Sequence, residues 1–161
     1  MRGFTPAPKP RRPLAWTIRD GGADIALTGD LDEGSDLEAV AREVSGGKVA
    51  IDLAGVGRIN SFGVSRWIRF LEGVTRVRGR RVSLAGLPTA FATAAALVPN
   101  MLKGATVESL LLVYRCDDCN REEEVAVRSA KEASAERACP ACRAAMIASV
   151  DREVVAGVLG G

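Results

Sequence analysis

The stretch VAIDLAGVGRINSFGV, residues 49–64, decides the fold class of this chain. It opens on Val-Ala-Ile-Asp-Leu after a Gly-Gly turn, and mostly apolar runs of this kind are typical of strands buried on both faces of a sheet. From Val64 onward, apolar side chains recur at i+3, i+4, i+7 and i+10, as far as Val74. That spacing predicts an amphipathic helix over residues 61–74. A buried strand that leads into such a helix predicts an α/β fold.

Strands and helices alternate on both sides of this stretch. Upstream, an apolar-polar alternation interrupted by the Asp-Gly-Gly turn at 20–22 predicts a β-hairpin. Over residues 14–114 the predicted order is strand, strand, and then helix and strand three times, which indicates a largely parallel sheet with helices packed on it. The other predicted elements are strands at 16–19, 23–28, 81–85 and 107–114, a helix at 36–44 with Ser35 as its N-cap, and an Ala-rich helix at 89–97.

Three segments with this order and spacing resemble the STAS family, which is named for sulfate transporters and antagonists of anti-sigma factors. They are ALTGDLD at 26–32, the stretch at 49–64, and RVRGRRVSLAGLPTAF at 76–91. The resemblance covers about residues 14–113 and implies a STAS-like domain, with a mixed sheet flanked by helices. It also implies the function of the antagonist members, which bind an anti-sigma factor that is a serine kinase.

The resemblance assigns a role to the loop at the start of the 61–74 helix. In antagonist members the first hydroxyl residue of this loop is phosphorylated, and Ser61 matches that position. The family's aspartate is Asn60 in this chain, its second small residue is Phe62, and its glycine is retained as Gly63. The resemblance therefore implies that Ser61 is the candidate phosphoryl acceptor, and that Asn60, Phe62 and Gly63 are candidate contacts for a partner.

The residues alone leave two interpretations of this loop. A phosphate on Ser61 would add about −1.5 to −2 charges at the positive end of the helix dipole, where it would change a docking surface. Alternatively, Ser61 is simply the N-cap of the helix, a role worth about 1 kcal/mol. Phe62 is likewise either an exposed interface anchor, with Trp67 beside it if that residue is also exposed, or a residue of the core.

All four cysteines lie in the last third of the chain, as two C-x-x-C pairs: Cys116 with Cys119, and Cys139 with Cys142. Two such pairs about twenty residues apart indicate a tetrahedral Zn²⁺ site, because each turn lets two thiolates converge on one metal. Four thiolates close the coordination sphere, so the predicted role of zinc is structural. Strand-like patterns at 124–128 and 145–150 complete a segment, residues 114–161, that resembles a zinc ribbon.

Disulfides, a redox dithiol and an iron–sulfur site are the alternatives for these cysteines. Disulfides fit poorly with the cytoplasmic location that we expect, since the N-terminus lacks the apolar core of a secretory signal. A thioredoxin-like dithiol needs only one pair. Residues 1–13 contain four of the seven prolines together with basic residues, which predicts a disordered basic tail.

Composition argues against an enzyme. The chain has 161 residues, 47% of them hydrophobic, and it has no histidine, which removes the commonest general base and the Ser-His and Cys-His pairs. We therefore expect a cytoplasmic regulatory module that binds a protein partner and does not insert into a membrane. A constitutive adaptor within a larger complex is the first alternative. A nucleic-acid-binding regulator is the second, although the net charge of +2 and the mixed signs around the cysteines argue against it.

Overall fold

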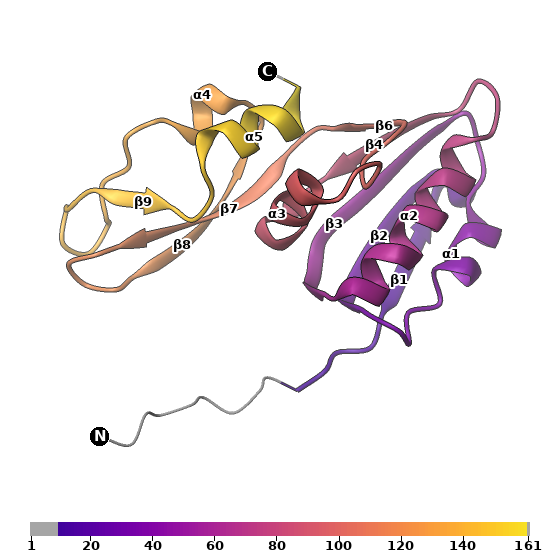
Figure 1. Ribbon diagram of the computed structural model, residues 1–161, viewed down its shortest axis with the longest axis horizontal. Helices are drawn as coiled ribbons and strands as arrows, with labels where there is room; N and C mark the ends of the chain where they lie inside the picture. Colours follow the sequence, from indigo (N-terminus) through magenta and orange to yellow (C-terminus); the bar gives the residue numbers. More distant parts are fainter. Residues whose placement is uncertain (1–9, 161) are drawn as a thin grey trace.

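Two sheets divide the chain between them in the computed structural model, which describes residues 10–160 (Figure 1). The first sheet has the strand order β1-β2-β3-β4-β6, in which β1 is antiparallel to β2 and the other neighbours are parallel. Its strands are β1 (Ala15–Arg19), β2 (Asp24–Leu31), β3 (Lys48–Ile59), β4 (Arg81–Ala85) and β6 (Ala105–Val107). The predicted mixed sheet is confirmed.

Helices cover one face of this sheet, and the burial pattern along β3 shows it. Val49, Ile51 and Leu53 are buried, whereas the residues between them, Ala50 and Asp52, are exposed. The prediction that this strand is buried on both faces is therefore wrong. An apolar run can lie in a half-covered sheet when its outward positions are filled by small or charged residues, because these lose little by contact with water.

Three helices complete this part: α1 (Leu37–Glu43), α2 (Ser61–Thr75) and α3 (Thr89–Leu97). Helix α2 buries Trp67, whose indole N–H donates to the Met101 carbonyl at 2.9 Å and whose ring meets Phe91 edge-on at 5.2 Å. Trp67 is therefore a core residue. The N-cap of α1 is Asp36, not Ser35, which is buried and donates to the Asp30 carbonyl instead.

The second sheet holds the cysteine-rich part of the chain. Its order is β5-β7-β8, and β9 pairs with the end of β7. It consists of β5 (Leu87–Pro88), β7 (Leu110–Cys116), β8 (Glu122–Val127) and β9 (Met146–Ala148), and it is accompanied by α4 (Ala130–Ala133) and α5 (Arg152–Leu159). The C-terminal segment thus forms a helix after its last strand.

The strand predicted at 107–114 is split between the two sheets. The break falls at Glu108 and Ser109, where the chain passes from a bond to the end of β4 to a bond with Gly86, the residue after β4. The Glu108 N–H donates to the Leu84 carbonyl at 2.8 Å, and the Ser109 hydroxyl accepts the Gly86 N–H at 2.9 Å. The chain leaves the first sheet at Val107 and enters the second.

The two sheets share one core. Strand β7 crosses the expected domain boundary at 113/114, and its first half pairs in parallel with β5, next to α3. The Thr89 hydroxyl, at the start of α3, donates to the Leu111 carbonyl at 2.9 Å. The cysteine-rich part is therefore joined to the segment between β4 and α3 by strand pairing, as well as by the connecting chain.

The structure describes only the last part of the disordered tail that is predicted over residues 1–13. Residues 1–9 lie outside the described residues. Arg11 and Arg12 lie against the end of β2, where the Arg12 carbonyl accepts the Asp30 N–H at 2.8 Å, so the disorder predicted over residues 1–13 does not extend to them. None of the helices within residues 10–160 is long and apolar enough to cross a membrane.

Candidate functional site

The four cysteines converge at one end of the second sheet. Cys116 is the last residue of β7, Cys119 lies in the turn that follows, and the other two occupy the turn before β9. The sulfurs of Cys116 and Cys142 are 3.4 Å apart, those of Cys119 and Cys139 are 3.5 Å apart, and all four lie within 4.8 Å of one another. The two C-x-x-C pairs therefore form one site.

This arrangement fits a tetrahedral metal ion. Metal–sulfur bonds of about 2.3 Å in a regular tetrahedron place the sulfurs about 3.8 Å apart, close to the separations in this cluster. Cys116 and Cys139 are buried, whereas Cys119 and Cys142 are exposed on the outer side. Four sulfur ligands leave no open position, so the cluster can hold a metal ion structurally but offers no place for a reacting molecule.

The charges in the cluster also favour a cation. The N–H groups of Cys142 and Ala141 point at the Cys139 sulfur and lower its pKa to about 6. The Ala144 N–H lowers the pKa of Cys142 in the same way, but the nearby Cys116 sulfur, burial and the other thiols together raise it to about 12. Four thiols this close cannot all ionise alone, and a bound cation removes the repulsion.

The two cysteine turns have the same backbone construction. In each turn the N–H of the first cysteine donates to the carbonyl five residues later, at 2.9 Å in the first turn and 2.8 Å in the second. Asn120 and Arg143, each directly after the second cysteine of its pair, have left-handed backbones with φ of 55° and 68°. Asparagine tolerates this region well, whereas an arginine there is strained.

The second candidate site is the loop at the start of α2. Asn60 is the N-cap of this helix, because its side-chain oxygen accepts the Gly63 N–H at 2.9 Å. The interpretation of Ser61 as the N-cap is therefore wrong. Ser61 is the first residue of α2 and is exposed, without a capping role.

The neighbours of Ser61 divide into exposed and buried residues. Phe62 is 64% exposed, so it is not a core residue. Gly63 is buried against β2, where an added Cβ would overlap the Leu31 carbonyl. Gly63 thus lets the helix start close to the sheet and faces the protein interior. Of the predicted contacts, only Phe62 presents a large side chain to solvent.

Phe62 stands at a groove between α1 and α2. The groove has a volume of about 630 Å³. Arg66 and Arg69 line it from α2, and Glu38 lines it from α1. An exposed aromatic ring beside a groove with arginine side chains has the composition of a protein interface, since aromatic residues and arginine are enriched there.

Sequence reasoning missed a charged cluster beside this loop. The carboxylate of Asp30, only 6% exposed, accepts the N–H groups of Arg12 and Arg58 at 3.0 and 3.1 Å and the Arg58 guanidinium at 3.0 Å. Burial raises the pKa of Asp30, but these donors outweigh it and hold the pKa below its usual value. Asp32 forms a bidentate pair with Arg11, at 2.5 and 2.6 Å. The acidic residues of the ALTGDLD segment were the available signal.

Comparison with protein-family models and with curated proteins finds no match for this chain. Its function is therefore inferred from its own geometry. That geometry comprises a closed cluster of four sulfurs that can hold a metal ion, and an exposed Ser61–Phe62 pair on the first turn of α2.

Proposed function

We propose that this protein is a non-enzymatic regulatory module of the STAS type, which binds a protein partner at the start of α2 and carries Zn²⁺ in a structural ribbon. The observation that carries the proposal is the first turn of α2. There Asn60 caps the helix, which leaves the consecutive residues Ser61 and Phe62 exposed on its first turn. The partner implied by the family resemblance is an anti-sigma factor with serine-kinase activity.

Phe62 supplies most of the binding energy in this proposal. A phenylalanine that is 64% exposed loses contact with water when it enters a pocket on a partner, and aromatic anchors of this kind dominate interface energetics. Arg66 and Arg69 in the adjacent groove favour a partner with an acidic patch around that pocket. Charge complementarity of this kind sets the orientation and speeds association.

Ser61 supplies the switch. The kinase partner transfers the γ-phosphoryl group of ATP to the Ser61 hydroxyl oxygen, which loses its proton, and ADP leaves. The free N–H groups of the first turn can accept the new charge, and that turn has no acidic residue. However, Glu33 lies close by, bonded to the Asn60 amide at 3.0 Å, so a dianion on Ser61 adds repulsion beside Phe62. Phosphorylation is therefore expected to weaken docking.

Zinc has a structural role in this proposal. The segment around the cysteines is too short to hold a core of its own, and small domains of this size usually need a metal or disulfides. Four thiolates at these separations suit Zn²⁺, which takes tetrahedral sulfur ligands without redox chemistry. The ion then fixes the two turns and, through β7, the sheet next to α3.

The test is to isolate the protein with its partner from its own cells, map its phosphorylated residues, and measure partner affinity for four variants. Ser61→Asp and Phe62→Ala are expected to weaken binding about tenfold or more. Ser61→Ala is expected to bind but to resist phosphorylation. Ser149→Ala is the matched control, since Ser149 is an exposed serine that does not line the groove beside Phe62.

Two results would contradict the proposal in different ways. A Ser61 that stays unmodified across growth conditions, in a stable complex that Phe62→Ala disrupts, would remove the switch and leave a constitutive adaptor. If Phe62→Ala binds the partner as well as the unaltered protein does, the docking surface is elsewhere.

A further inference from the structure

Helix α3 is exposed on one side although it has no charged residue. Its sequence is TAFATAAAL, and the next charged residue along the chain is Lys103. Phe91 and Ala92 face the core, but Ala96 and Leu97 are exposed, Leu97 by 79%. Surface helices ordinarily carry charged side chains on their outward face. The outward face of α3 instead carries Thr93, Ala96 and Leu97, so it is less polar than the face of an ordinary surface helix.

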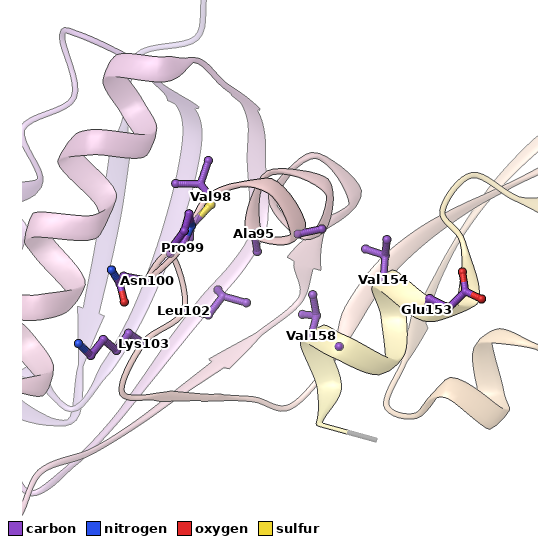
Figure 2. Close-up of a pocket in the computed structure, with 12 residues that line it drawn as sticks. Ala95, Val98, Pro99, Asn100, Leu102, Lys103, Glu153, Val154 and Val158 are labelled. Carbon is purple, nitrogen blue, oxygen red and sulfur yellow. The ribbon is translucent and has the colours of Figure 1, made fainter.

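An apolar groove lies directly beside this helix (Figure 2). It has a volume of about 520 Å³ and runs between the end of α3, the loop that follows, and α5. Ala95 and Leu102 line it from one side, and Val154 and Val158 line it from α5. Because Ala95 and Gly157 are small, the walls stand apart and leave room for a side chain from outside.

The groove has opposite charges at its two ends. Lys103 lies at one end and Glu153 at the other, with the apolar residues between them, as Figure 2 shows. Both side chains are exposed, and within residues 10–160 neither forms an ion pair. Such a surface is complementary to itself: a half-turn about an axis through the middle of the groove brings each lysine onto a glutamate.

We propose that the face formed by α3, residues 98–103 and α5 is the interface of a two-fold symmetric homodimer. Lys103 of each copy pairs with Glu153 of the other, and Leu97, next to two lining residues, enters the partner's groove. In an isologous interface a contact from residue i to residue j is repeated from j to i, so one complementary pair counts twice. A partner of a different kind would need its own matching charges at the same spacing, whereas a second copy has them already.

The dimer interface is separate from the proposed docking site. None of the residues that line this groove belongs to the Ser61 loop or to the groove beside Phe62. Two copies joined at α3 and α5 would thus present two docking sites. The proposal does not depend on phosphorylation of Ser61 or on the identity of the partner.

The test is a charge exchange measured by sedimentation of the full, metal-loaded chain over a range of concentrations. The unaltered protein is expected to dimerise. Lys103→Glu and Glu153→Lys, each alone, place like charges together and are expected to raise the dimer dissociation constant about tenfold or more. An equimolar mixture of the two variants is expected to dimerise again, because each glutamate of one then meets a lysine of the other.

Two further variants test whether the apolar contact of Leu97 contributes to dimerisation independently of the charged pair. Leu97→Asn is expected to weaken the dimer without rescue by mixing. Val77→Asn is the matched control, since Val77 is 46% exposed and does not line this groove, and it is expected to leave the dimer intact. A protein that stays monomeric at all concentrations, or a dimer that neither charge reversal weakens, would overturn the proposal.

Discussion

Arg143 has a backbone angle that is expected to lower the stability of the second cysteine turn. Its φ of 68° lies in the left-handed region, which costs a residue with a Cβ about 1 kcal/mol or more, and glycine adopts this region freely. We expect Arg143→Gly to stabilise the metal-loaded protein by about 0.5–1 kcal/mol, after allowance for the extra freedom that glycine gives the unfolded chain. Urea unfolding of the two proteins measures the difference.

The control for this substitution is Arg121→Gly in the other cysteine turn. Arg121 also lies close to the sulfurs but is not among the residues with positive φ, so glycine removes no strain there. It is expected to destabilise the protein by about 0.5–1 kcal/mol. If both substitutions change stability in the same direction, backbone strain at Arg143 is not the cause.

The low pKa of Asp30 predicts how the stability of the folded protein changes as pH falls. Because its pKa is held below the usual value in the folded protein, the unfolded chain binds its proton first as pH falls. The stabilising contribution of Asp30 is therefore complete above about pH 4, the ordinary aspartate pKa, and is lost as pH falls through the lower folded value. We expect Asp30→Asn to cost about 1–3 kcal/mol at pH 7, since buried donors lose a charged acceptor.

The measurement is the difference in unfolding free energy between the unaltered protein and Asp30→Asn from pH 7 downward. The difference is expected to stay constant to about pH 5 and to shrink below about pH 4. Both proteins carry the same cysteine cluster, so its own response to acid cancels in the comparison. Asp151→Asn is the control, because Asp151 is exposed and its side chain makes no capping bond. A difference that grows in acid would contradict the prediction.

At the scale of the elements, periodicity predicted where helices and strands lie but not which sheet a strand joins. Helix α2 was expected at 61–74 and spans Ser61–Thr75, because five apolar residues at helical spacing leave little choice of period. The apolar run at 107–114 contains no pattern that indicates where it is divided or which sheet each part joins. Its division between β6 and β7 falls at hydrogen bonds from Gly86 and to Leu84, which lie more than twenty residues away in the chain.

The first residue of α2 could not be predicted from local sequence either. Asparagine and serine are both good N-caps, so composition could not choose between Asn60 and Ser61. The choice depends on tertiary contacts: the Asn60 N–H donates to the Leu31 carbonyl, and Gly63 fits against the same carbonyl. These contacts fix the helix one residue earlier than a serine cap would require. The exposure of Ser61 and Phe62 follows from that register.

At the scale of the whole molecule, spacing predicted the cysteine cluster fully, whereas the way it joins the rest of the chain had no local signal. Two C-x-x-C pairs indicate a cluster that can hold a metal ion, because few other arrangements use four converging sulfurs. The parallel pairing of β5 with β7 involves only Leu87 and Pro88 on one side, too short a strand to recognise from pattern. It is this pairing that makes the cysteine cluster part of the common core.

Removal of the metal tests that coupling. We expect a chelator, or Cys139→Ser, to abolish protection from amide hydrogen exchange in β7, β8 and β9, because the two cysteine turns then lose the ion that we propose joins them, and they open. Since β7 also pairs with β5 and accepts the Thr89 hydroxyl, exchange is expected to rise in α3 as well. Strands β2 and β3, which pair over most of their length in the first sheet, are expected to keep their protection.

Hydrogen exchange followed by mass spectrometry resolves these three regions in one experiment. One equivalent of Zn²⁺ added back after chelation is expected to restore protection in the second sheet and in α3 together, whereas Cys139→Ser is not expected to recover. If α3 keeps its protection while β7 loses it, the β5–β7 pairing does not couple the two sheets. If β2 and β3 lose protection too, the chain unfolds as a single unit, and the first sheet depends on the metal as much as the second does.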